Sequence, residues 1–167
     1  MPIPEPLATT LAALNLAPTC HAHPPLRTVE DAHAIWDGLP GAQVKNLFIK
    51  DAGKQYWLVV VPGDPRMDTK AMAPLIGSKR ISFGSADDLR AILGVEPGSV
   101  TPLAMMNDGG RQVRLVIHAP LMQAARLLVH PLVNTATLEM APDDLVRFLG
   151  HHGVTPALVD LEPAFLS

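Results

Sequence analysis

The segment from Val44 to Val61 constrains the fold of this chain more than any other. It contains two runs rich in β-branched, aliphatic and aromatic residues, separated by Asp51-Ala52-Gly53-Lys54. Asp and Gly form turns, and such runs on either side of a short turn are typical of a β-hairpin. Both faces of the first run are mostly apolar, as expected of a strand that is covered on both sides. The sequence therefore predicts a hairpin within a covered sheet.

Two polar residues, Lys45 and Asn46, interrupt the apolar pattern of the first strand. A lysine that is drawn out of water must find a partner or lower its pKa, because desolvation disfavours the charged form. Two interpretations remain open. Either Lys45 lies at the start of the strand and extends to solvent, or the pair faces a pocket.

Length and composition limit the classes of protein that need to be considered. At 167 residues, of which 48% are hydrophobic, the chain is expected to form one domain, residues 1–167, with a real core. The net charge of −3 argues against general affinity for nucleic acid, so such a contact would need a local basic patch. Because no predicted helix carries clustered Lys or Arg, DNA binding is not expected.

The amino-terminal region and the single cysteine favour a cytoplasmic protein. The first residues, M-P-I-P-E-P, lack the pattern of a signal peptide, and no apolar run is long enough to span a membrane. Cys20 has no second cysteine with which to form a disulfide. Cys20, His21 and His23 are of metal-binding types, but their spacing does not match a zinc site. We therefore expect neither a metal nor a cofactor.

Turn formers and caps divide the rest of the chain into short helices and strands. Because these do not alternate regularly, the predicted class is α+β with a mixed sheet. The expected helices cover residues 5–16, 29–38, 68–76, 86–93 and a segment that starts at Pro142. The expected strands after the hairpin cover residues 81–83, 127–130, 135–140 and 157–161, with a second hairpin formed by 103–106 and 113–118.

Three further segments are candidates for a functional site, although each also has a plain structural explanation. The Gly98–Pro102 loop could bring its backbone close to a ligand, or it could be a simple connector. His130 ends an apolar strand, where a lone histidine is more often a buried structural residue. Ser78-Lys79-Arg80 is either a solvated loop or a phosphate contact.

Six motifs along the chain together resemble a known family. In order, they are H-P-P-L-R-T-V-E-D-A (23–32), V-K-N-L-F (44–48), P-G-D (62–64), K-R-I-S-F (79–83), G-x-x-x-P (98–102) and H-P-L-x-N (130–134). The ordered set resembles the YbaK/prolyl-tRNA synthetase-associated domain family of trans-editing deacylases. The K-N pair and the H-P-L-x-N segment are most similar to its free-standing alanyl-tRNA(Pro) deacylase branch.

The resemblance implies a fold, a reaction and a set of site residues. The fold would be a single-domain, mixed but mainly antiparallel, barrel-like sheet flanked by helices. The reaction would be hydrolysis of the ester of mischarged tRNA(Pro). Lys45 would hold the ester or the terminal phosphodiester, Asn46 would orient the terminal adenosine or the carbonyl, and His130 would shape the pocket. The loop of Gly98, Ser99, Val100, Thr101 and Pro102 would hold the α-amino group, and Lys50 and Arg80 would contact acceptor-stem phosphates.

Two departures from the family pattern leave the identity of the amino acid open. Arg27 and Val129 replace aromatic residues that many relatives carry there. Alanine is the first choice and cysteine the second, with serine also to be tested. A non-catalytic module that binds tRNA or a synthetase is the alternative of a different class. Prolyl-tRNA synthetase and elongation factor are the protein partners that the resemblance suggests.

Overall fold

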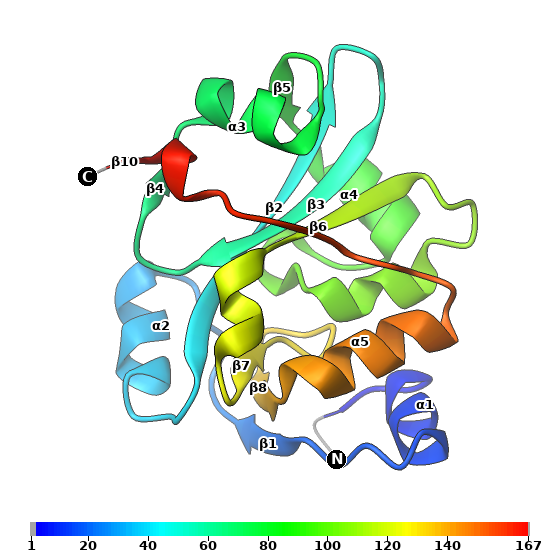
Figure 1. Ribbon diagram of the computed structural model, residues 1–167. Coiled ribbons are helices and arrows are strands. Elements are labelled where there is room, and N and C mark those ends of the chain that lie inside the picture. Colours follow the sequence, from blue (N-terminus) through cyan, green and yellow to red (C-terminus); the bar gives the residue numbers. More distant parts are fainter. Residues whose placement is uncertain (1–2, 167) are drawn as a thin grey trace.

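The computed structural model describes residues 3–166, which form a mixed α+β fold (Figure 1). The helices are α1 (Leu7–Ala13), α2 (Val29–Trp36), α3 (Thr69–Ile76), α4 (Ala86–Leu93) and α5 (Pro142–His151). The strands are β1 (Thr19–Ala22), β2 (Ala42–Asp51), β3 (Tyr56–Pro62), β4 (Arg66–Met67), β5 (Ile81–Phe83), β6 (Val113–His118), β7 (Leu127–Val129), β8 (Ala136–Met140), β9 (Ala157–Val159) and β10 (Phe165–Leu166). Short 3₁₀ turns include η1 (Pro97–Ser99), η2 (Pro102–Asn107), η3 (Ala119–Gln123) and η4 (Glu162–Ala164).

The main sheet has the strand order β1-β8-β7-β2-β3-β6-β9, with β5 paired to β2 outside this path. Its ladders are of both kinds: β2 runs antiparallel to β3, whereas β3–β6, β6–β9 and β2–β7 are parallel. The predicted α+β class, with a mixed sheet flanked by helices, is therefore confirmed. None of the helices in residues 3–166 is long and apolar enough to cross a membrane.

The predicted central hairpin is present, formed by β2 and β3. Its register pairs Val44 with Pro62 and Lys50 with Tyr56. The turn is held by the Asp51 carboxylate, which accepts hydrogen bonds from the backbone N–H groups of Gly53 and Gln55 at 2.8 and 3.1 Å. An aspartate that satisfies turn N–H groups in this way explains why the chain reverses here.

The helices begin at the residues that the sequence marks as caps. Thr28 forms a capping box with Asp31 at the start of α2, while Asp68 and Ser85 cap α3 and α4. Gly77 and Gly94 follow α3 and α4 with left-handed backbone, a conformation that costs glycine little. The first helix is shorter than predicted, because α1 covers only Leu7–Ala13.

The predicted hairpin between residues 103–106 and 113–118 is wrong. Residues 103–106 belong to η2, which Thr101 caps by accepting a hydrogen bond from the Leu103 N–H group. The partner of β6 is instead β3, which lies parallel to it. Leu103, Ala104 and Met105 are all buried, and an unbroken apolar run of this length fits a buried helical turn as well as a strand.

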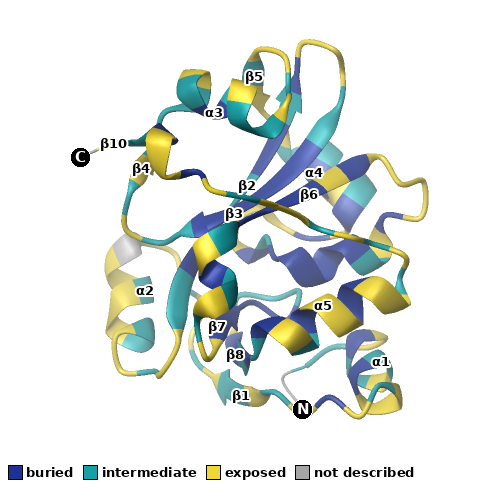
Figure 2. Cartoon of the chain, in the orientation of Figure 1, coloured by how far each residue is buried: buried dark blue, intermediate teal, exposed yellow. Residues whose placement is uncertain are grey.

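Apolar clusters lie on the two faces of the β2–β3–β6 layer. The larger one contains Phe48, Leu58 and Phe148, and the smaller one contains Ile49, Val59 and Met72 under α3. The alternation of Phe48 and Ile49 between them is the strand period of two that the sequence predicted. Figure 2 shows the central strands and the inner side of α5 as buried, whereas α2 is only partly covered.

Candidate active site

One edge of β2 is unpaired in its middle. On the side away from β3, β7 pairs with Ala42 and Gln43, and β5 pairs with residues from Ile49 to Asp51. The carbonyl oxygen of Phe48 accepts a hydrogen bond from the Gly84 N–H group at 2.9 Å, so within residues 3–166 the stretch that no strand covers on that side is Val44 to Leu47. A short open edge inside an otherwise paired sheet gives a ligand access to both faces of a rigid strand.

A cavity of about 250 Å³ lies at this open edge. It is lined by the consecutive β2 residues from Val44 to Leu47, together with Trp36, Pro97, Gly98, Val100, Leu128 and His130. Consecutive residues of a strand point to opposite faces. The cavity therefore extends around the edge of β2 and brings Lys45, Asn46, His130 and part of the Gly98–Pro102 loop together.

Lys45 is half-buried, and its ammonium group turns toward the segment after β3. Nζ donates a hydrogen bond to the carbonyl oxygen of Pro65. Burial lowers the pKa of Lys45 below its usual range, an effect that Asp64 opposes and Arg66 reinforces. The side chain thus has one protein acceptor, which leaves other N–H groups of the ammonium for an anionic or carbonyl ligand.

Asn46 carries an orphaned acceptor. Its Oδ1 atom is buried and has no hydrogen-bond partner in the structure. An unsatisfied buried acceptor costs about 1–3 kcal/mol, so it is uncommon in a native protein. Because Asn46 lines the cavity, a ligand with an N–H or O–H group could satisfy this atom.

His130 lies 8% exposed where β7 meets the cavity. Its Nδ1–H group donates to the carbonyl oxygen of Ala136 at 3.4 Å, so Nε2 is the bare nitrogen. Burial lowers the pKa of His130 and outweighs the opposing effect of the Ala136 hydrogen bond. The ring is thus held neutral, with Nε2 available as a hydrogen-bond acceptor.

The five residues of the predicted substrate loop do not all face the cavity. Gly98 and Val100 line it. Ser99 lines a neighbouring pocket with Asn134, whereas Thr101 and Pro102 are buried and start η2. The loop thus contributes a glycine and an apolar wall to the cavity, and its hydroxyl side chains lie elsewhere.

Sequence reasoning missed the side chain that closes the cavity on the α2 side. The indole of Trp36 packs against His130, with ring centroids 5.6 Å apart. Its Nε1–H group donates to the Thr137 hydroxyl at 3.0 Å, and that hydroxyl in turn donates to Nε2 of His23 at 2.8 Å. Thr137 is fully buried in β8. The only signal in the sequence was an aromatic residue on the apolar side of α2.

Lys50 and Arg80 lie outside the cavity. Lys50 is near the far end of β2, where its ammonium group stacks 5.2 Å from the centroid of the Tyr56 ring. Arg80 is exposed and lines a groove beside α3 with Thr69 and Lys70. Both cations are on the hairpin side of the molecule, beyond the open edge of β2.

Two of the three residues of metal-binding type near the amino terminus, His21 and His23, have protein partners, whereas Cys20 is a free cysteine. His21 bonds to Glu139 across β1 and β8, and His23 takes part in the Thr137 chain. Within residues 3–166, no group of three or more His, Cys, Asp or Glu side chains is arranged to hold a metal ion.

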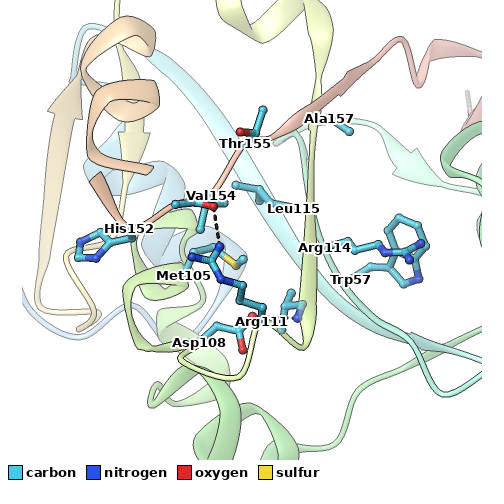
Figure 3. A pocket seen from close by; sticks show the side chains of 12 residues that line it. Trp57, Met105, Asp108, Arg111, Arg114, Leu115, His152, Val154, Thr155 and Ala157 are labelled. Carbon is cyan, nitrogen blue, oxygen red and sulfur yellow. Dashed lines mark hydrogen bonds between the residues drawn. The ribbon is translucent and has the colours of Figure 1, made fainter. Parts of the chain in front are cut away.

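A second cavity, of about 320 Å³, lies beside β6, toward the β9 edge of the sheet (Figure 3). β9 pairs with β6 only from Val116 onward, so this cavity also lies next to an incompletely paired strand. Two of its polar side chains are already engaged, but Nε2 of His152, which also lines the cavity, is buried without a hydrogen-bond partner. Arg111 donates to the carbonyl oxygen of Gly153 at 2.7 Å, and the guanidinium of Arg114 stacks on Trp57.

Comparison with known proteins identifies the family. The model of the aminoacyl-tRNA editing domain matches residues 23–148, a range that contains every predicted site residue. This chain belongs to the aminoacyl-tRNA editing domain family. The resemblance inferred from the six motifs is thereby confirmed.

Individual members of the family match along nearly the whole chain. A prolyl-tRNA editing protein of Acetoanaerobium sticklandii is 34% identical over 90% of this chain and 93% of its own length. Prolyl-tRNA synthetase associated domain-containing protein 1 of Xenopus laevis is 34% identical over 95% and 96%. The crystal structure of a hypothetical protein is also similar, with a TM-score of 0.71 and 25% identity over 92% of this chain and 97% of that one.

Proposed function

We propose that this chain hydrolyses the aminoacyl ester of mischarged tRNA(Pro), with alanine as the amino acid removed. One observation carries the proposal: Lys45, Asn46, His130 and Gly98 line a single cavity at the open edge of β2. The names of two relatives, which refer to prolyl-tRNA editing and to prolyl-tRNA synthetase, support tRNA(Pro) as the carrier.

The proposed role of each side chain follows from its hydrogen-bonding state. The Lys45 ammonium group stabilises negative charge on the ester carbonyl or on the terminal phosphodiester. The unpartnered Oδ1 of Asn46 accepts a hydrogen bond from an N–H or O–H group of the terminal aminoacyl-adenosine, which fixes its orientation. The bare Nε2 of neutral His130 accepts from water or from a ribose hydroxyl.

The proposed chemistry needs positioning more than a strong nucleophile. An aminoacyl ester is already activated, so water can attack it when the carbonyl is held in place and the developing oxyanion is stabilised. The ribose hydroxyl beside the ester can assist by hydrogen bonding. The Gly98–Pro102 loop holds the α-amino group through backbone carbonyl oxygens. No step in this scheme uses a metal.

Size provides the selectivity. Prolyl-tRNA synthetase cannot readily exclude alanine, because a smaller amino acid fits a larger pocket. The selective part of the cavity is the wall formed by Trp36, Val100 and Leu128, against which a methyl side chain would fit and the bulkier proline ring would clash. The correct product, prolyl-tRNA(Pro), is thereby spared.

The test measures amino acid release from tRNA(Pro) that has been charged separately with alanine, cysteine, serine or proline. We expect rapid release of alanine and spontaneous rates for proline. Lys45→Ala should abolish enzymatic release while circular dichroism shows an intact fold. Arg147→Ala, which removes a cation from α5 away from the cavity, serves as the matched control and should release alanine at the wild-type rate.

Other outcomes separate the alternatives. Preferential release of cysteine would assign the chain to Cys-tRNA(Pro) instead. Spontaneous rates for all four esters, together with measurable tRNA binding, would identify a binding module and contradict the proposed enzyme. The participation of prolyl-tRNA synthetase or elongation factor, and the cytoplasmic location, stay predictions. Adding either protein to the same assay tests the first of these.

A further inference from the structure

We propose that a basic face formed by Arg66, Lys70, Lys79 and Arg80 binds the phosphate backbone of the substrate RNA, and that Phe83 stacks on an unpaired base of its 3′ end. This inference rests on the proposed function and extends it to three residues, Arg66, Lys70 and Phe83, for which the sequence patterns predicted no contact with RNA. It also gives the direction from which the RNA approaches the cavity.

The charge of this face differs from that of the whole chain. Residues 65–84 contain the four cations of the basic face and a single carboxylate, Asp68, whereas the chain has a net charge of −3. The Asp68 carboxylate is occupied by the backbone N–H groups of Lys70 and Ala71 at the start of α3. Within residues 3–166, none of the four cations forms an ion pair with a side chain. Lys70 and Arg80 line the same groove, and cations without ion-pair partners favour an anionic polymer.

The basic face is hollowed where α3 and β5 meet. A groove of about 370 Å³ is lined by Thr69, Lys70, Ala73, Arg80 and Ile81. In Figure 1, α3 and β5 lie together beside the hairpin end of β2 and β3. Lys70 of α3 and Arg80, which lies in the loop between α3 and β5, therefore line one groove that the phosphate backbone of an RNA could follow.

Phe83 adds an aromatic surface next to these cations. Its side chain is 67% exposed, although it lies in register opposite Ile49, which is fully buried. Residues that lie directly opposite in an antiparallel pair point to the same face, so Phe83 projects on the face of β2 that carries Lys45. Exposed aromatic rings beside cations are how proteins commonly hold single-stranded nucleic acid.

The position of Phe83 along β2 sets how far the RNA end would have to reach from the cavity. Ile49 and Asn46 are three residues apart on β2, which corresponds to about 10 Å along the strand. Cytidines precede the terminal adenosine of tRNA, and one of them would reach Phe83 while the ester lies at Asn46. The RNA would then lie on the Lys45 face, with the amino acid passing around the open edge of β2 into the cavity.

Other exposed apolar residues lack this combination. Val146, Leu158 and Leu166 are also exposed, but they belong to α5, β9 and β10. None of them is an aromatic residue, so none offers a ring on which a base could stack. This contrast favours RNA over a protein partner as the ligand of the basic face.

The experiment compares two substrates, Ala-tRNA(Pro) and the minimal ester alanyl-adenosine, under steady-state conditions. Phe83→Ala should raise KM for Ala-tRNA(Pro) about tenfold with kcat unchanged. Phe83→Trp, which keeps an aromatic ring, should retain the wild-type KM. Lys70→Gln should make the plot of log(kcat/KM) against log salt concentration less steep, by about the slope that one phosphate contact contributes. Neither Phe83→Ala nor Lys70→Gln should alter hydrolysis of alanyl-adenosine.

Leu158→Ala and Arg147→Gln are the matched controls, because they remove an exposed apolar side chain and a cation from other faces. An unchanged KM for Ala-tRNA(Pro) in Phe83→Ala would overturn the proposal, as would an equal loss with alanyl-adenosine. An effect that appears only when prolyl-tRNA synthetase is present would also overturn it, in favour of a protein ligand. Failure of the wild type to hydrolyse either ester would instead refute the proposed function, and anisotropy with uncharged tRNA(Pro) would then still test the basic face.

Discussion

The two cavities beside incompletely paired strands differ in which polar groups they bring together. At β2, the Oδ1 atom of Asn46 is buried without a partner and His130 presents a bare nitrogen. At β6, Arg111 is bonded to the Gly153 carbonyl, and Asp108 accepts from the N–H groups of Gln112 and Val113 at 3.0 and 2.8 Å. The second cavity is larger, and Arg111 and Asp108 on its wall serve the fold, although Nε2 of His152 there is also buried without a partner. The β2 cavity is the stronger candidate because it brings an unpartnered acceptor together with Lys45, His130 and the backbone of Gly98.

The largest expected effect comes from comparing two substitutions, one at each cavity, for their effects on activity and on stability. Asn46→Ala should lower kcat/KM for Ala-tRNA(Pro) about 100-fold. It should change the free energy of unfolding by less than about 1 kcal/mol, because Oδ1 has no protein partner to lose. Arg111→Ala should leave kcat/KM unchanged and reduce the unfolding free energy by about 1 kcal/mol. Single-turnover deacylation and urea denaturation measure the two quantities, and the reverse pattern would contradict the assignment.

A smaller effect is expected from the hydroxyl that anchors Trp36. Thr137→Val keeps the shape of the side chain but leaves the indole N–H group of Trp36 and Nε2 of His23 without their partner. We expect about a tenfold loss of kcat/KM through misplacement of the cavity wall. Thr137→Ser retains the hydroxyl and is the control; it should keep most of the activity, and a loss as large as that of the valine variant would argue against the anchor.

The pH dependence of stability should reflect His130. Burial lowers its folded-state pKa below the ordinary value of 6.5, so the unfolded chain binds the proton more tightly. The corresponding stability is fully present above pH 6.5 and is lost as the pH falls toward the lowered folded-state pKa. His118 and His152 are shifted in the same direction by burial. Urea titrations at pH 5.5 and 7.5 should therefore differ less for His130→Asn than for the wild type, and an identical difference would be inconsistent with a buried, neutral ring.

The smallest predicted change concerns the loop glycine. A Cβ atom at Gly98 would lie 3.4 Å from Nδ2 of Asn134, an ordinary contact, and Gly98 is not among the residues with left-handed backbone. Gly98→Ala should therefore alter the unfolding free energy by less than about 1 kcal/mol. If the loop backbone holds the α-amino group, this variant should still raise KM for Ala-tRNA(Pro) severalfold. An unchanged KM would exclude close approach of the substrate at this position.

The sequence predicted the features that local chemistry determines. The β2–β3 hairpin, the caps at Thr28, Asp68 and Ser85, and the strand before His130 all follow from short-range patterns. The Lys45-Asn46 pair was recognisable because polar residues are unusual in a covered strand. Both pair members line the cavity, so the pocket interpretation fits the structure better than simple extension of Lys45 to solvent.

The remaining features depend on contacts between distant segments. Nothing local distinguishes a buried 3₁₀ turn from a strand in residues 103–106, and the parallel pairing of β6 with β3 joins segments more than fifty residues apart. The Trp36–Thr137 hydrogen bond spans 101 residues. Such pairings are determined by tertiary packing, which residue patterns do not encode directly.

The most direct test of the central claim asks which cavity binds the end of the substrate. A non-hydrolysable analogue, with an amide in place of the ester of alanyl-adenosine, would be titrated into ¹⁵N-labelled protein and followed by NMR. We expect shifts of the Asn46 side-chain amide, the Gly98 backbone amide and the Trp36 indole, with Arg111 and Gly153 unchanged. Shifts centred on Arg111 and Gly153, with Asn46 and Trp36 unaffected, would contradict the central claim.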